Sequence, residues 1–173
     1  MTDIYLLIFD ALESDSEHRF DWIYHSRGDK VVCDVAKNDI KLTDKYPGGE
    51  YIRDCRQGTT ADMIRIRFEN QDITTYMTMV EWKDTVVTIG SGVGASITDR
   101  VPIIMVGREG RSAHFAAVLE PVLAGNKPHV SGIQCTGKNE SPTITVERGR
   151  QTDRVRILPG DRALVTLSQQ SVQ

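Results

Sequence analysis

The sequence predicts an all-β protein built as an antiparallel two-sheet β-sandwich, with residues 1–173 forming one domain. Three observations support this prediction. Apolar and polar residues alternate with a period of two along several segments, which is the pattern of half-buried strands. Turn-forming residues recur about every 10–15 residues, as they do between short antiparallel strands. No long segment has the 3.6-residue apolar period of a helix, and the nearest candidate, 113–123, contains Pro121 and β-branched flanks.

The expected strands follow one another along the whole chain. Uniformly apolar or β-branched runs predict strands buried on both faces, at 4–9, 30–35, 73–80, 85–89, 101–106 and 114–119. Strictly alternating segments predict strands with one exposed face, at 64–69, 143–147, 154–157 and 163–167. A further segment, 18–26, is rich in aromatic residues, which favour strands.

Turn-forming residues separate these segments. Gly, Pro, Asn and Asp, which tolerate positive φ or fix a bend, cluster at 28–29, 47–49, 69–72, 107–110, 137–139 and 159–161. Two longer connections are expected, the polar segment 37–49 and the glycine-rich segment 90–96, and the tail 168–173 is expected to fray. The glycines of 90–96 do not indicate a dinucleotide site, because the next residues lead into a strand and not into the helix which that site requires.

The charge pattern excludes some classes of partner. The chain has 21 Lys and Arg against 24 Asp and Glu, a net charge of −3, with both signs interspersed. Nucleic-acid binding needs a basic stripe, so no nucleic-acid partner is expected. No apolar run approaches the length of a membrane span, and the first run follows an acidic start, so neither a membrane partner nor an export signal is expected.

Cysteines and histidines give no pattern of a metal site, and no cofactor is expected. The chain has three cysteines, without CxxC spacing: Cys33, Cys55 and Cys135. One disulfide with a free thiol and three free thiols both stay open. His18 and His25 are separated by an odd interval, so a strand places them on opposite faces, and the other two histidines stand singly.

The aromatic segment 18–26 holds the first candidate binding residues. On a strand, Trp22 and Tyr24 share one face, and Asp21 and His25 share the other. Trp22 and Tyr24 are candidates for stacking on a sugar ring, and His25 and Asp21 are candidates for binding or titrating near a carboxylate. The alternative is that the aromatic rings pack in the core. Trp82, between Glu81 and Lys83, is the best candidate for an exposed aromatic residue, and core packing is the alternative there too.

Two longer passages resemble a known family. The first joins Tyr5-Leu6-Leu7-Ile8-Phe9-Asp10 with Glu17-His18-Arg19-Phe20-Asp21-Trp22-Ile23-Tyr24-His25-Ser26. The second runs from Arg100-Val101-Pro102 through Gly107-Arg108-Glu109-Gly110 to Ala113-His114-Phe115-Ala116-Ala117-Val118-Leu119-Glu120-Pro121. Together they are similar to the C-terminal β-sandwich of heparinase II/III-like polysaccharide lyases, including oligoalginate lyases, over residues 3–167. The resemblance implies a super-sandwich-like fold.

The resemblance also implies a chemistry, the cleavage of uronic-acid polysaccharides by β-elimination. In that family a helical toroid supplies groups around the substrate, and the opening part of the sandwich supplies a zinc site. No position of this chain matches those groups, so none is carried over, and no catalytic or metal-binding residue is assigned. We therefore expect the chain to be the sandwich portion of such a lyase, without complete catalytic machinery of its own.

Three functional hypotheses follow. The first is an accessory region that packs on an α-toroid lyase domain encoded separately. The second is a stand-alone carbohydrate-binding module, and the third is an independent lyase. The candidate residues for binding an acidic polysaccharide or oligosaccharide are Trp22, Tyr24, His25, Trp82 and Arg108. The resemblance alone suggests a periplasmic or extracellular location.

Overall fold

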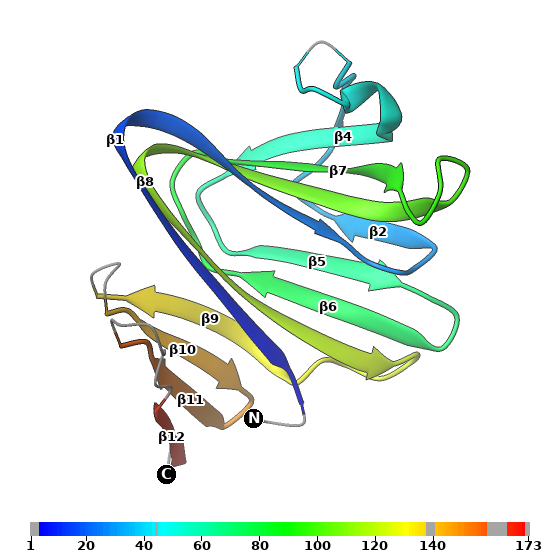
Figure 1. Ribbon diagram of the computed structural model, residues 1–173. Helices are drawn as coiled ribbons and strands as arrows, with labels where there is room; N and C mark the ends of the chain where they lie inside the picture. Colours follow the sequence, from blue (N-terminus) through cyan, green and yellow to red (C-terminus); the bar gives the residue numbers. More distant parts are fainter. Residues whose placement is uncertain (1–3, 44, 138–140, 159–165, 172–173) are drawn as a thin grey trace.

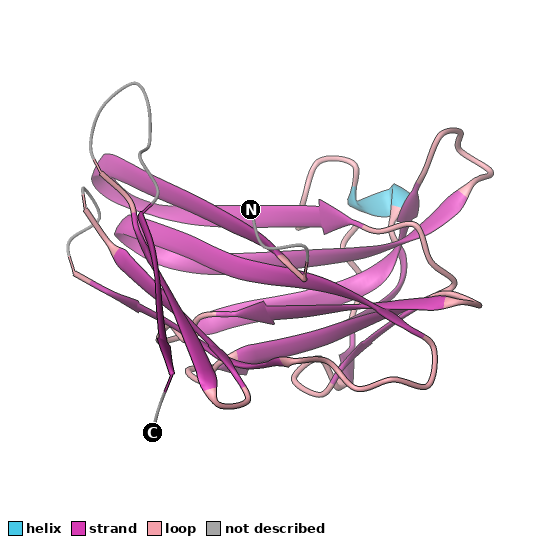
Figure 2. Ribbon diagram, turned by 90° about the horizontal axis from the view of Figure 1, so that it is seen from below, coloured by secondary structure: helices cyan, strands magenta, loops and turns pink. Residues whose placement is uncertain are grey.

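Two antiparallel β-sheets account for most of the computed structural model, which describes residues 4–43, 45–137, 141–158 and 166–171. Figure 2 shows strands joined by loops, with one short helical turn, η1 (Gly49–Tyr51). The strands are β1 (Leu6–His25), β2 (Lys30–Cys33), β3 (Asn38–Asp39), β4 (Arg53–Thr60), β5 (Ile64–Glu69), β6 (Ile73–Met79), β7 (Thr85–Val93), β8 (Arg100–Leu123), β9 (Val130–Thr136), β10 (Thr143–Arg148), β11 (Gln151–Arg156) and β12 (Thr166–Ser171). The predicted all-β, sandwich-like fold is confirmed.

The large sheet is folded into two halves by its two longest strands. In sheet order it runs β2-β5-β6-β8-β7-β4-β3, and β1 pairs with the other edge of β8. The first part of β8 pairs with β7 and its last part pairs with β6, while β1 accompanies it along both parts. Figure 1 shows β1 and β8 turning together from the half that holds β4 and β7 to the half that holds β5 and β6. We call these the β4–β7 half and the β5–β6 half.

The continuity of β1 and β8 corrects part of the sequence prediction. Segments 4–9 and 18–26 were expected as two strands but lie on one, and the same is true of 101–106 and 114–119. The predicted turn at 107–110 is a bend inside β8, with Gly110 at φ +152. A register shift between Glu13 and His18 lets β1 follow that bend without leaving the ladder.

The glycine-rich segment 90–96 is also largely strand and not loop. β7 continues to Val93, and only the residues from Gly94 to β8 form a connection. At Gly90 a side chain has no room, because a Cβ there would lie 2.9 Å from the carbonyl oxygen of Arg53. Glycine therefore serves close strand packing here, and the segment is not a mobile loop.

Three apolar clusters hold the layers together. The largest fills the space between the two halves and includes Ile66, Phe68, Met77 and Phe115. A second lies between the outer face of the β5–β6 half and the small sheet, ordered β12-β11-β10-β9. The third lies on the outer face of the β4–β7 half, under the connection that contains Leu42. The sheets are thus stacked layers that bury apolar residues on both sides of the β5–β6 half.

A buried polar cluster fastens the small sheet to the start of β1. Arg148 donates to both carboxylate oxygens of Asp153, at 2.8 and 2.9 Å, and the Tyr5 hydroxyl donates to the same carboxylate at 2.8 Å. Asp153 is 2% exposed and Arg148 is 9% exposed. The hydrogen bonds from Arg148 are the main reason why the pKa of Asp153 lies below its ordinary value.

Candidate functional site

The predicted aromatic candidates of β1 lie on the inner face of the large sheet. Trp22 and Tyr24 are partly buried against the central core, and their rings lie 5.8 Å apart with an interplanar angle of 8°. Tyr24 also contacts Phe68, with the ring centroids 5.5 Å apart, and Trp22 Nε1 donates to Asp10 at 2.9 Å. The expectation that Trp22 and Tyr24 share one face is confirmed. Both rings pack against the core, as the alternative interpretation expected. Their role in sugar stacking stays a prediction that this position does not favour.

His25 lies on the opposite face of β1 and is exposed. Its imidazole lies beside Gly92 of β7, where a Cβ would be 3.2 Å from Nε2. The described residues contain no group of three or more His, Cys, Asp or Glu side chains placed to hold a metal ion. His25 is therefore an accessible side chain that belongs to no such group.

Trp82 and Arg108 come together at the bend between the two halves. Arg108 is fully buried and its guanidinium lies 5.3 Å from the Trp82 ring and 4.8 Å from the Phe115 ring. It donates to the carbonyl oxygens of Val80, at 2.8 Å, and His114. Neither β6 nor β7 pairs with β8 between Gly107 and Ala117, while β1 still pairs with its other edge, and the guanidinium donates to carbonyl oxygens at this gap.

Burial is also the main reason why the pKa of Arg108 falls to about 10, which still leaves the group charged at neutral pH. A fully buried guanidinium cannot meet a polysaccharide in this structure. Arg108 therefore has a structural position in the core, and this position does not support the predicted role in binding polysaccharide. The five predicted residues lie at three separate places: the inner face of β1, the outer face of β1 and the bend.

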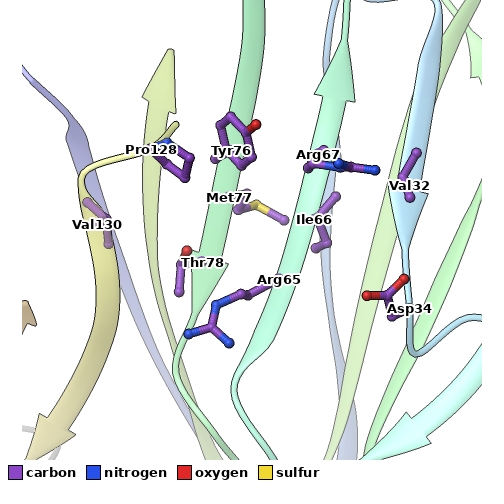
Figure 3. A pocket seen from close by; sticks show the side chains of 10 residues that line it. All are labelled: Val32, Asp34, Arg65, Ile66, Arg67, Tyr76, Met77, Thr78, Pro128 and Val130. Atoms are coloured by element: carbon purple, nitrogen blue, oxygen red, sulfur yellow. The ribbon is translucent and has the colours of Figure 1, made fainter. Parts of the chain in front are cut away.

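A shallow groove on the outer face of the β5–β6 half unites residues that the prediction had not selected. Its volume is about 300 Å³. Strands β2, β5 and β6 form its floor, and the approach to β9 forms a wall, as Figure 3 shows. The lining residues are Val32, Asp34, Arg65, Ile66, Arg67, Tyr76, Met77, Thr78, Pro128 and Val130.

Strand register explains why two arginines and a tyrosine meet in this groove. Arg65 and Arg67 alternate with buried Ile66 on β5, so both point outward. Arg67 is the register partner of Tyr76 on β6 and of Val32 on β2, and Arg65 is the partner of Thr78. Side chains at partnered positions share one face, so the groove combines cationic, aromatic and hydroxyl groups.

Both guanidinium groups keep donors for a ligand. Arg65 donates once to the Ser131 carbonyl oxygen at 2.8 Å, and no other described residue takes its remaining donors. Arg67 lies 3.4 Å from Glu69, an ion pair whose side chains are both more than a third exposed. Such an exposed pair is weak and is easily exchanged for another carboxylate. The two guanidinium groups therefore suit an anion that presents carboxylate oxygens, and Asp34 is the one acidic residue among the lining residues.

The sequence held a signal for this groove, although the prediction used it only to assign a strand. The alternation Arg65-Ile66-Arg67 places two cations on one face. What the sequence does not show is the pairing that brings Tyr76 beside Arg67 and the docking that places Pro128 and Val130 as a wall.

The three cysteines are free thiols in this structure, which is one of the two alternatives that the sequence left open.

No protein-family model matches the chain, and no curated protein matches it. Among the described residues, no helix is long and apolar enough to cross a membrane.

Proposed function

We propose that this chain is an accessory β-sandwich of a uronic-acid polysaccharide lyase, which binds anionic polysaccharide in the groove over β5 and β6 and has no complete catalytic machinery of its own. The observation that carries the proposal is the convergence of Arg65, Arg67 and Tyr76 on one exposed groove. A planar guanidinium pairs with a carboxylate through two parallel hydrogen bonds. A tyrosine ring offers an apolar face for the C–H groups of a sugar and a hydroxyl for its oxygens.

The shape of the groove suits a chain and not a small enclosed substrate. The residues lie on a sheet face with one wall, and the arginines stand two positions apart on a single strand. A polymer with repeated carboxylates can therefore meet both guanidinium groups in succession along β5. Exposed contacts of this kind give modest affinity per site and depend on ionic strength.

The groove carries only part of a set of groups typical of an elimination site, namely two arginines, Tyr76 and Asp34, without a histidine. Such a reaction requires a base for the sugar proton, an acid for the leaving oxygen and a cation for the carboxylate, all within reach of one sugar. The two arginines fit the last role, but no histidine lines the groove. This supports binding over catalysis and is in line with the resemblance to the sandwich part of heparinase II/III-like lyases.

The alternative is a carbohydrate-binding module that works without an α-toroid lyase domain. The same groove serves either role, so the two differ only in the partner. Co-purification with a separately encoded toroid domain, together with lyase activity that appears only in the mixture, distinguishes the accessory role. Binding that is complete without any such partner supports the module.

The groove itself is tested by a charge-removal pair with a matched control. Arg65→Gln/Arg67→Gln removes both cations, and Arg154→Gln/Arg156→Gln removes an equivalent Arg-x-Arg pair from the exposed face of β11. We expect the first pair to weaken binding to alginate, heparan sulfate or hyaluronan by about tenfold or more in affinity electrophoresis. The control pair should change it by less than about twofold.

Two outcomes contradict the proposal. One is an equal loss in both double variants, which would mean that net charge alone attracts the polymer. The other is the absence of binding by the unmodified chain to any of the three acidic polymers at low ionic strength. Neutral dextran serves as the ligand control, because it offers hydroxyl groups without carboxylates.

A further inference from the structure

A second, smaller cleft lies at the end of the sandwich opposite the bend. Its volume is about 220 Å³, and it opens between the two halves where β2, β4, β7 and β8 have their ends. Figure 1 shows β2 between the strands of the two halves at this position. The polar side chains that line it are Asp29, Lys30, Asp54, Arg56, Ser91 and Arg100.

The charged groups around this cleft are not paired with one another. None of the five charged side chains in this list forms an ion pair within 4.0 Å with any residue that the structure describes. Three cations and two carboxylates that face one small space without pairing leave both acceptor and donor sites open to a ligand. Elsewhere on the same sheets, neighbouring opposite charges do pair, as Arg19 does with Asp21 at 2.9 Å.

Local backbone geometry presents these groups to the cleft. Arg100 is held by Ser91, since its guanidinium donates to the Ser91 hydroxyl at 3.2 Å and to the Ser91 carbonyl oxygen. The ladder between β4 and β7 shifts register between Arg53 and Arg56, and Asp54 within that shift has φ +53. Bulges of this kind redirect side chains, and here Asp54 and Arg56 both line the cleft.

We propose that this cleft binds a single small polyhydroxylated carboxylate, such as one free hexuronate. Lys30, Arg56 and Arg100 bind the carboxylate, and Asp29 and Asp54 accept hydrogen bonds from the hydroxyl groups. The volume lies below the range of about 300–1,000 Å³ that holds drug-sized ligands, so it suits one sugar and not a chain. The site lies apart from the groove over β5 and β6, shares no lining residue with it and does not depend on polymer binding there.

The test is a titration of the isotope-labelled full chain with D-glucuronate, followed by amide chemical shifts. We expect shifts in the backbone that lines the cleft, at Gly90, Ser91 and Val101, with a dissociation constant in the millimolar range. Arg56→Gln should raise that constant by about tenfold, and Lys30→Gln provides a second variant if the first does not fold. Arg154→Gln, on the exposed face of β11 and outside the cleft lining, should change it by less than about twofold.

Ligand and site controls make every outcome decisive. Glucose lacks the carboxylate and acetate lacks the hydroxyl groups, so both should bind at least about tenfold more weakly than glucuronate. Equal binding of acetate would overturn the hydroxyl-reading role of Asp29 and Asp54. If Arg65→Gln/Arg67→Gln abolishes the shifts, the uronate binds in the groove and the cleft proposal fails, while the proposed function stands. An absence of shifts at about 20 mM glucuronate overturns the cleft proposal alone.

Discussion

Removal of the Asp153 carboxylate is the sharpest test of how the small sheet is attached. Asp153→Ala leaves the buried Arg148 guanidinium without its counter-charge and the Tyr5 hydroxyl without that acceptor. Breaking a buried ion pair by removing one partner costs about 3–5 kcal/mol of unfolding free energy. For a chain of this length, that corresponds to a fall in melting temperature of roughly 6–20 °C, at about 2–4 °C per kcal/mol.

Two further variants separate charge burial from packing. Asp153→Asn keeps the shape and one carbonyl acceptor but removes the charge, so its loss should be smaller than that of Asp153→Ala. Arg148→Met/Asp153→Leu removes both charges together, and this replacement should restore much of the stability. The double variant should therefore be more stable than Asp153→Ala, although it carries more substitutions.

Urea denaturation followed by circular dichroism and by tryptophan fluorescence measures these differences. Both probes should move together, because the cluster joins the small sheet to β1. A loss of less than about 1 kcal/mol in Asp153→Ala would refute the reasoning, since that is the value of an ion pair in solvent. A double variant that is less stable than Asp153→Ala would refute it as well.

Four other predictions follow from the same structure. The pKa of Asp153 is lowered in the folded state, so its stabilisation is present above the ordinary carboxyl pKa and is lost as pH falls through the lowered value; acid titration of unfolding free energy should show this loss, and Asp153→Asn should flatten it. Arg108→Ala should lower stability by about 3 kcal/mol, because it leaves the carbonyls of Val80 and His114 without this donor and opens a cavity; calorimetry measures this, and a change below about 1 kcal/mol would contradict the buried position. Burial raises the pKa of the Cys33 and Cys55 thiols, so a disulfide reagent should react with them slowly in the folded chain and rapidly in urea; equal rates would show that both are accessible. The isolated chain should give no rise in unsaturated-uronate absorbance with any acidic polymer, and a rise that is lost in His25→Ala would establish an independent lyase.

Local patterns were sufficient for the strand class and for the orientation of individual side chains. The alternation at 64–69 correctly places Ile64, Ile66 and Phe68 inside and the arginines outside. The same period assigns Trp22 and Tyr24 to one face of β1 and His25 to the other. These results follow because side-chain direction in a strand depends only on the position of a residue relative to its neighbours.

The largest difference between prediction and structure concerns Arg108 at the bend, which was predicted to bind polysaccharide and is buried. Arginine is a residue that is usually exposed on a strand, yet Arg108 is fully buried. It lies where β6 and β7 diverge from β8, and its guanidinium donates to the carbonyl oxygens of Val80 and His114. Nothing in the residues around position 108 reports the path of strands that lie far away in the chain. Burial at such a point is decided by which strands pair, and not by the local pattern.

The amino-acid sequence by itself determined that this protein is made of antiparallel strands and which side chains alternate across them, because both depend on neighbouring residues. Only the tertiary structure decided that β1 and β8 are continuous, that Arg65, Arg67 and Tyr76 share a groove, and that five unpaired charges face one cleft. Register, bending and sheet docking join residues that are distant along the chain, and their energies come from packing that no local segment contains.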